Sequence, residues 1–206
     1  MQETRDRIIA SAVELFEKKG YHSTTIQEIG EKAGVSKGAV FHYFSSKNEI
    51  LFLIHEKFIN VILNRAENVL KRSDLGTAEK LRELIVNLVE LIAEYKPYVV
   101  VFFQEFKYVE QERLPLIKEK RDRCEQIYRR VLEQGMSAGE FRKDLDPDMV
   151  TKAIFGMCDW SHQWLNPGGR LTPREIGLTF WKILLEGIGR TQPDIDPVRR
   201  SMAINL

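Results

Sequence analysis

The residues best suited to contact another macromolecule lie between positions 24 and 47, where the chain reads TTIQEIGEKAGVSKGAVFHYFSSK. Two stretches of helical periodicity flank a glycine in this segment, which is the pattern of a helix-turn-helix. On the second stretch Val40 and Phe44 are four residues apart and would face the core. Lys37 and His42 would then lie on its outer face, which a recognition helix presents to the major groove of DNA.

The turn and the helix ends add further features of a DNA-binding motif. Gly34 permits a tight turn between the two helices. Gly38 would let the backbone of the second helix approach DNA closely, where a helix N-terminus can accept a phosphate. Lys47, at the start of a further helix, is placed to pair with another phosphate. Phosphate contacts give affinity and register, whereas sequence specificity needs contacts to base edges.

Charge composition argues neither for nor against a nucleic-acid partner. The formal net charge of the chain is only +1. Residues 1–47 contain seven Lys or Arg and six Asp or Glu, so the N-terminal segment is not a basic domain. The DNA-binding interpretation therefore depends on where particular side chains are placed.

Helical periodicity continues through the chain and predicts an all-α fold of about nine helices. The first two helices should end at Gly20 and Gly34, and Thr25 and Ser36 are good N-caps for the helices that follow. The pair Ser45-Ser46 should cap a long fourth helix.

The second half of the chain is interpreted in the same way. The run 98–106, YVVVFFQEF, could be a buried strand, but it has no partner strand, so we expect a helix. The segment 135–146 is expected to be a loop, and Pro147 should open the next helix. Thr172 should begin the last helix, which we expect to end near 189, and the tail 191–206 should be irregular.

The stretch IGEKAGVSKGAVFHYFSSKNEIL, with the amphipathic helix before it, resembles the signature of the TetR family of transcriptional repressors. The resemblance implies a helix-turn-helix domain at residues 1–46 and a ligand-binding and dimerisation domain at residues 47–206. It also implies a homodimer, whose two-fold symmetry requires double-stranded operator DNA with an inverted repeat. By position, the resemblance assigns DNA binding to these residues: Thr25, Gln27, Ser36, Lys37, Gly38, Phe41, His42, Tyr43 and Lys47.

Two positions depart from the family's usual pattern. Gly30 stands where the family usually has alanine, and it should cost about 1 kcal/mol of helix propensity. Phe41 stands where tyrosine is frequent, so one hydroxyl that could reach DNA is absent.

The last two predicted helices have more apolar surface than one subunit would cover. Their stripes are Ile154, Met157, Trp160, Ser161 and Trp164, and then Ile176, Phe180, Ile183, Leu184 and Gly187. A partner helix is implied, and in TetR-like proteins these two helices pair with their twins in the dimer. A purely intramolecular core is the alternative.

A ligand pocket is expected where the run 98–106 meets the following helix. On that helix Arg121 falls on an otherwise apolar seam, so it needs an anionic partner or a route to solvent. It either forms an internal contact or receives the anionic group of a largely apolar ligand. The expected ligand-binding residues are Phe102, Phe103, Phe106, Arg121, Tyr128, Met157, Trp160 and Trp164.

The segment GMCDWSHQWLNPGGRLTPREIGLTFWKILLEGI is similar to the C-terminal part of the fatty-acid-degradation and steroid-catabolism repressors of this family. That similarity implies control of fatty-acid or lipid metabolism, with release from the operator by a long-chain acyl-CoA. The alternative within the family is a sensor of lipophilic cationic drugs that controls efflux. Glu105, next to Phe106, would then be the partner of the cation.

Other classes of protein are less compatible with the sequence. The four histidines show no metal-ligand spacing, and neither G-x-S-x-G nor a glycine-rich phosphate loop occurs, so we expect no enzyme, metal or cofactor. A helical interaction protein that has lost its DNA contacts is a second alternative. Against it stand the intact Lys37, His42, Tyr43 and Lys47.

The sequence also gives an expectation of where the protein works. The two cysteines are far apart and lack C-x-x-C spacing, which fits a reducing cytoplasm. The charged first residues predict no signal peptide. No stretch approaches the roughly 20 apolar residues of a membrane span, so we expect a cytoplasmic protein without a membrane partner.

Overall fold

The computed structural model describes residues 2–166 and 168–189, and this part of the chain forms nine α-helices without a β-strand. The elements are α1 (Gln2–Lys19), α2 (Ile26–Ala33), α3 (Lys37–Tyr43), α4 (Lys47–Leu70), α5 (Thr77–Glu94), α6 (Lys96–Gln104), the 3-10 helix η1 (Phe106–Tyr108), α7 (Leu114–Ala138), α8 (Pro147–Trp164) and α9 (Pro173–Ile188). The predicted all-α fold is confirmed, while the tail predicted to be irregular, 191–206, lies outside the described residues. Among the described helices, none is long and apolar enough to cross a membrane.

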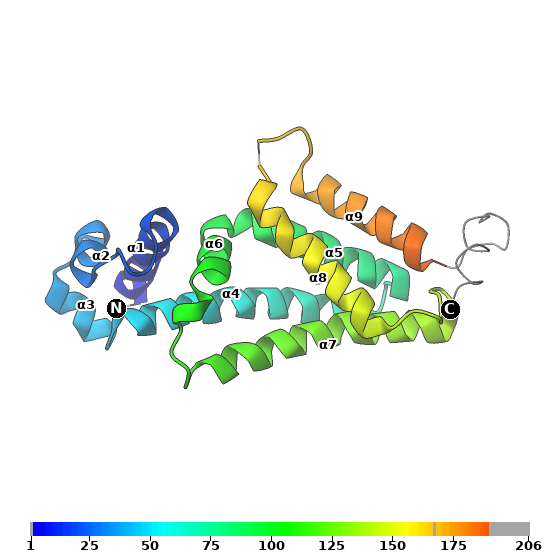
Figure 1. The fold of residues 1–206 in the computed structure, drawn as a ribbon, viewed down its shortest axis with the longest axis horizontal. Coiled ribbons are helices and arrows are strands. Elements are labelled where there is room, and N and C mark those ends of the chain that lie inside the picture. The colour runs from blue at the N-terminus through cyan, green and yellow to red at the C-terminus, as the bar shows by residue number, and fades with distance from the viewer. Residues whose placement is uncertain (1, 167, 190–206) are drawn as a thin grey trace, which may run out of the picture.

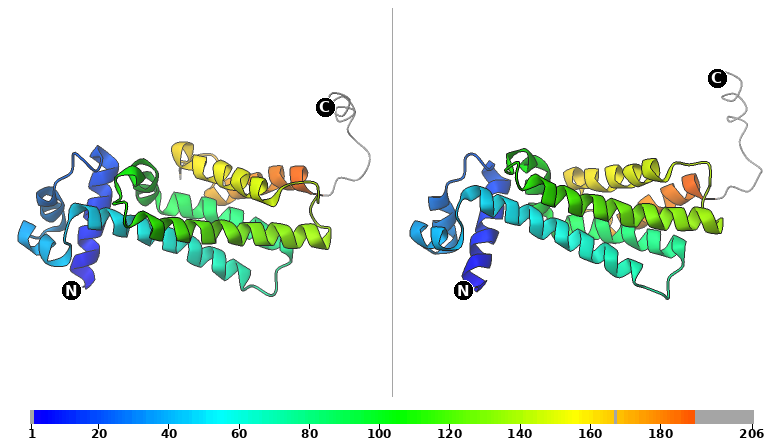
Figure 2. Two further views of the ribbon diagram at one scale, coloured as in Figure 1. Left: turned by 60° about the horizontal axis from the view of Figure 1, so that its bottom comes forward. Right: turned by 90° about the horizontal axis from the view of Figure 1, so that it is seen from below.

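The helices form an elongated molecule with α1, α2 and α3 at one end (Figure 1). Helix α4 leaves this end and runs beside α7 along the larger part of the molecule (Figure 2). Helix α5 packs on α4, α7 and α8, and α9 packs mainly on α5. Buried apolar residues form one continuous core from α1 to α9. Packed side chains therefore connect the larger part of the molecule with the N-terminal helices.

Short-range capping fixes the ends of the N-terminal helices as the sequence predicts. Thr25 and Glu28 form a capping box at the start of α2. Ser36 caps α3 and Ser46 caps α4, each by accepting a hydrogen bond from a backbone N–H in the first turn. Gly34 ends α2 with a φ of 68°, a left-handed conformation that glycine adopts without strain.

The run expected to be a helix rather than a strand is helix α6, so that prediction is confirmed. Pro97 lies in the first turn, where its missing N–H leaves no hydrogen bond unmade. Val99, Val101 and Phe102 are buried on one side of the helix.

The prediction of a loop from residue 135 is wrong at its start, because α7 continues to Ala138. The ring of Phe141 lies over Gly135, and a Cβ at Gly135 would lie only 2.3 Å from the ring. Gly135 therefore leaves space beside α7 for the ring of Phe141, and it does not end the helix. The helix ends at Gly139, whose φ is 77°.

Candidate functional site

Helices α2 and α3 form a helix-turn-helix at one end of the molecule (Figure 1). The turn is closed by a hydrogen bond from the Val35 N–H to the Gly30 carbonyl, at 2.9 Å. Val40 and Phe44 are buried as expected and hold α3 against the core. A Cβ on Gly30 would lie 2.9 Å from the Val35 carbonyl oxygen. The absence of a side chain at Gly30 therefore leaves space for the turn. The sequence predicted only the loss of helix propensity at Gly30 and did not reveal this role.

The surface formed by the expected DNA-binding residues faces solvent. Phe41 is 47% exposed, so it is not a core aromatic like Phe44. Tyr43 and Lys47 are partly buried. The exposed members of the expected set are Thr25, Gln27, Ser36, Lys37, Gly38, Phe41 and His42.

Several of these side chains also hold the motif together. The hydroxyls of Thr25 and Ser36 cap their helices, and the Gln27 amide donates to Glu31 at 2.8 Å. Lys37 and His42 have no such structural hydrogen bond among the described residues, which leaves them available to an external partner. Thr25, Gln27 and Ser36 thus stabilise the motif through hydrogen bonds within the chain. The side chains of Lys37 and His42 are not used in this way.

Lys47 has a structural role that the sequence did not reveal. Its ammonium donates to the carbonyl oxygens of Tyr21 and Thr24, both at 2.7 Å, and lies over the Tyr21 ring. Burial lowers the pKa of Lys47, and the nearby Glu105 carboxylate opposes that shift. Two of its three N–H groups are thus used within the chain, and a phosphate contact would use the third.

The loop between α1 and α2 is attached to the end of α6. Buried Glu105 accepts a hydrogen bond from the Tyr21 N–H at 3.2 Å. The Tyr21 ring stacks on Tyr108 of η1 at 5.7 Å, and Asn48 donates to the Tyr108 carbonyl at 2.6 Å. We call Tyr21, Asn48, Glu105 and Tyr108 the junction cluster. The junction cluster connects the end of α6 to the DNA-binding end of the molecule. Within it, Glu105 accepts a hydrogen bond from a backbone N–H and does not contact a ligand site.

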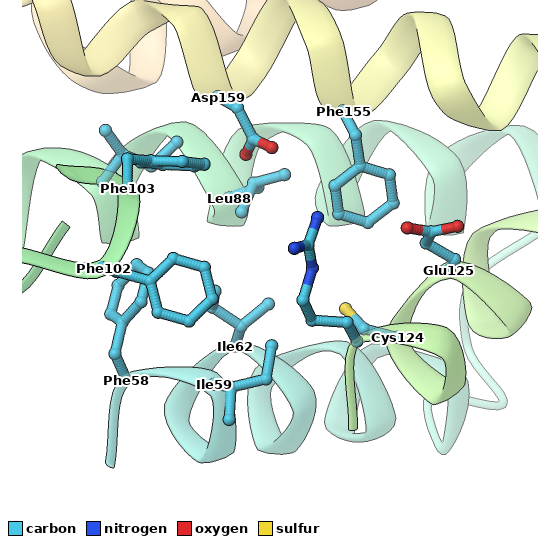
Figure 3. A pocket seen from close by; sticks show the side chains of 12 residues that line it. Phe58, Ile59, Ile62, Leu88, Phe102, Phe103, Cys124, Glu125, Phe155 and Asp159 are labelled. Atoms are coloured by element: carbon cyan, nitrogen blue, oxygen red, sulfur yellow. The ribbon is translucent and has the colours of Figure 1, made fainter. Parts of the chain in front are cut away.

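A mostly apolar cavity of about 50 Å³ lies between α4, α5, α6, α7 and α8 (Figure 3). It is lined by Phe58, Ile59, Ile62, Leu88, Ile92, Phe102, Phe103, Arg121, Cys124, Glu125, Phe155 and Asp159. Phe103 is 36% exposed and its ring stacks on His162 at 4.7 Å, so these two rings join α6 to α8 beside the cavity. A drug-sized ligand needs roughly 300 Å³ or more, so an effector of that size has to open this cavity.

Three charged groups line this apolar cavity. Arg121 and Glu125 lie on α7, and Figure 3 shows the Asp159 carboxylate directed into the cavity from α8. Burial raises the pKa of Asp159 to about 7, with Arg121 lowering and Glu125 raising it. Arg121 forms no hydrogen bond or ion pair with any described residue, so an internal salt bridge, one of the alternatives for this residue, is not formed there.

The structure brings together only part of the expected ligand set. Phe102, Phe103 and Arg121 line the cavity as predicted. Phe106 lies beside them, against Phe102 and His55, but does not reach the cavity.

The other four members of the expected ligand set lie elsewhere. Tyr128 is fully buried, and its hydroxyl donates to the Leu84 carbonyl at 2.9 Å. Met157, Trp160 and Trp164 lie outside the cavity lining. Trp160 and Trp164 are on the outward face of α8, with 65% and 49% of their surface exposed. A helical stripe does not identify which neighbour it faces, so the sequence pattern alone could not show which of its residues would line the cavity.

The cavity also contains residues that sequence reasoning did not assign to it. Phe58 from α4 and Phe155 from α8 provide aromatic walls. Asp159 could have been predicted to line the cavity, because it is a carboxylate among apolar residues of a predicted helix. A charged side chain among apolar residues is also the pattern that identified Arg121.

The outward faces of α8 and α9 are apolar and unpaired in the single chain. The predicted stripe on α8 is divided, because Ile154 and Ser161 are buried while Trp160 and Trp164 are exposed. The large exposed apolar residues of the two helices are Met149, Trp160, Trp164, Leu178, Ile183 and Leu185.

Comparisons with known proteins agree with this arrangement. Residues 8–54 match the family described as "Bacterial regulatory proteins, tetR family", and residues 74–188 match "Tetracyclin repressor-like, C-terminal domain". The chain is 29% identical over 185 residues to the HTH-type transcriptional repressor KstR2 of Mycobacterium tuberculosis (strain ATCC 25618 / H37Rv), covering 89% of this chain and 92% of the relative. It is 28% identical over 153 residues to the fatty acid metabolism regulator protein of Bacillus subtilis (strain 168), covering 74% and 78% respectively.

Solved structures show the same fold. The structure of the ketosteroid transcriptional regulator KstR2 of Mycobacterium tuberculosis has a TM-score of 0.82 at 28% identity, covering 91% of this chain and 95% of that one. The structure of AibR in complex with isovaleryl coenzyme A and operator DNA has a TM-score of 0.79 at 21% identity, covering 87% and 97%, a likeness of fold alone. With its helix-turn-helix, its larger helical domain and both family matches, the chain belongs to the TetR family of bacterial transcriptional regulators.

Proposed function

We propose that the chain is a homodimeric repressor that binds an inverted-repeat operator through α3 and is released by a long-chain acyl-CoA. The observation that favours control by an effector is the position of α6. Phe102 and Phe103 of this helix line the cavity, and Glu105 at its end accepts the hydrogen bond from Tyr21 in the DNA-binding part. One short helix therefore touches both the cavity and the part that contacts DNA.

The proposed mechanism is a shift between two arrangements of the dimer. An acyl chain that enters beside Phe103 must separate α6 from α8, because the closed cavity is only about 50 Å³. Movement of α6 would displace the junction cluster and change the spacing of the two recognition helices from the ~34 Å that successive major grooves require. An effector that binds the non-DNA arrangement 100-fold better supplies roughly 2.7 kcal/mol of coupling.

Two features support an acyl-CoA as the effector. The cavity walls are largely aromatic and aliphatic, as a fatty chain requires. Among relatives, one is named as a fatty acid metabolism regulator, and AibR, of the same fold, was solved with isovaleryl coenzyme A and DNA. The fatty-acid or lipid pathway is inferred from these similarities.

A sensor of lipophilic cations remains the second candidate because of one specific observation. Asp159 and Glu125 line an aromatic cavity, and carboxylates beside aromatic rings are suited to bind a cation. The carboxylate first expected to do this, Glu105, does not line the cavity. Cation binding would therefore depend on Asp159 and Glu125.

The test is fluorescence anisotropy of the protein on the DNA upstream of its own coding sequence, titrated with palmitoyl-CoA and with a lipophilic cationic dye. Release by palmitoyl-CoA alone is expected, and release by the dye alone would replace the ligand class while keeping the regulator. If this fragment is not bound, a genome-wide selection of bound fragments follows, and its failure would contradict DNA binding.

The same assay tests the DNA-contacting face. Lys37→Glu should weaken operator binding at least tenfold, because it replaces a cation by an anion on the helix face that is proposed to enter the major groove of the negatively charged DNA. Lys143→Glu is the matched control, since Lys143 is exposed and follows the C-terminal end of α7, which lies at the opposite end of the molecule from α3 (Figure 1). Equal affinity of the two variants would contradict the assigned DNA-binding surface.

A further inference from the structure

The arginine of the cavity has hydrogen-bond donors without acceptors. Arg121 is partly buried, lines the cavity and forms no hydrogen bond or ion pair with the described residues. A guanidinium has five N–H donors and no acceptor, and burying such donors unpaired is costly. A ligand oxygen in the cavity would satisfy them.

The cavity already has more negative than positive groups. Asp159 faces it from α8 and Glu125 from α7, and neither side chain is held in a hydrogen bond or ion pair with a described residue (Figure 3). With all three groups ionised, the sum of Arg121, Asp159 and Glu125 is one negative charge. A ligand carboxylate placed at Arg121 would be the third carboxylate beside a single cation, in an environment where like charges repel strongly.

We propose that the Arg121–Asp159–Glu125 cluster selects an uncharged acyl oxygen, such as a thioester carbonyl, and that Asp159 excludes free carboxylates. The inference rests on the proposed acyl-CoA response and identifies which part of the effector meets Arg121. An uncharged carbonyl accepts hydrogen bonds from the guanidinium without adding charge. The anionic coenzyme moiety stays outside the apolar walls. A sensor built in this way distinguishes an activated acyl group from the free fatty acid.

Proton uptake is the route by which a free carboxylate can still bind. Burial raises the pKa of Asp159 to about 7, above the range of an ordinary carboxyl group, so Asp159 can be protonated when a second anion approaches Arg121. The titratable and charged groups around Asp159 are Arg121, Cys124, Glu125 and Tyr128 of α7, together with Cys158 and His162 of its own helix. Helices α5 and α6 contribute only apolar side chains to the cavity lining: Leu88, Ile92, Phe102 and Phe103.

The test is isothermal titration calorimetry with two probes of the same chain length, S-octanoyl-N-acetylcysteamine as the neutral thioester and octanoate as the free acid. The wild-type protein should bind the thioester at least tenfold more tightly at pH 8. Asp159→Asn should raise octanoate affinity at least tenfold and so remove most of the preference for the thioester. Asp122→Asn, an exposed carboxylate on α7 that removes the same charge, should leave both affinities unchanged.

The wild-type protein gives an independent measurement. If octanoate requires protonated Asp159, its affinity should rise about tenfold between pH 8 and pH 6, because the protonated fraction changes by that factor around a pKa of about 7. Asp159→Asn should abolish this dependence. The variant should fold, because a raised carboxyl pKa means that stability falls as pH rises toward 7, and asparagine removes that penalty.

The outcomes separate this inference from the proposed function. Octanoate affinity that is unchanged or lower in Asp159→Asn would overturn the inference, as would failure of both probes to bind. If palmitoyl-CoA still releases operator DNA in those cases, the acyl-CoA response stands and only the role of Asp159 is wrong. If palmitoyl-CoA releases nothing either, the proposed effector class fails as well.

Discussion

If the proposed dimer forms through α8 and α9, replacing Trp160 by alanine should leave a monomer at concentrations where the wild-type protein is dimeric. Trp160 is 65% exposed on α8, on the same helical face as Met149 and Trp164, which are also exposed. A large exposed apolar surface of this kind usually marks an interface. In a two-fold dimer through α8 and α9 each Trp160 is buried by the partner, so one substitution removes two side chains.

The magnitude follows from the exposed fraction. A tryptophan side chain has up to roughly 250 Å² of surface, and the 65% left exposed in Trp160 is about 160 Å². At about 25 cal/mol per Å², its burial stabilises the dimer by at most about 4 kcal/mol per side chain. Truncation of such anchor residues often costs about 2 kcal/mol or more. Truncation of both Trp160 side chains of the dimer then lowers the free energy of association by at least about 4 kcal/mol. This corresponds to a dimer dissociation constant that is higher by a factor close to a thousand.

Sedimentation equilibrium of the wild-type protein and of Trp160→Ala measures this constant directly. Leu116→Ala is the matched control, because Leu116 is 49% exposed but lies on α7. The control should stay dimeric. A dissociation constant for Trp160→Ala within a few-fold of the wild-type value would refute the assignment of this face to the dimer.

Two further substitutions test contacts inside the chain. Glu105→Gln should lower the melting temperature by about 2–4 °C, because a neutral amide replaces a charged acceptor of the Tyr21 N–H at a loss of about 1 kcal/mol. Calorimetry beside the exposed control Glu112→Gln checks this, and equal melting temperatures would contradict it. Tyr128→Phe should lose about 1 kcal/mol of unfolding free energy with its hydrogen bond to Leu84. An unchanged urea midpoint would disprove that contribution.

Much of the fold could be predicted because its determinants are short-range. Capping by Thr25 and Ser36 joins residues three positions apart, and the left-handed turn needs only Gly34. Apolar residues repeating every three or four positions identify a helix wherever it packs. The misplaced loop at Gly135 shows the limit of such rules, because the reason for that glycine is the ring of Phe141, which only the folded chain places over it.

The sequence by itself determined that this is a helical protein with a helix-turn-helix, and it placed the residues expected to contact DNA within one contiguous segment. Only the tertiary structure decided which side chains face the cavity between α4, α5, α6, α7 and α8. Asp159 meets Arg121 because α8 packs on α7, and Lys47 meets the carbonyls of Tyr21 and Thr24 because the start of α4 lies beside α1. A helical stripe specifies a face but not its neighbour, so the direction in which Trp160 points is set by long-range packing rather than by local sequence.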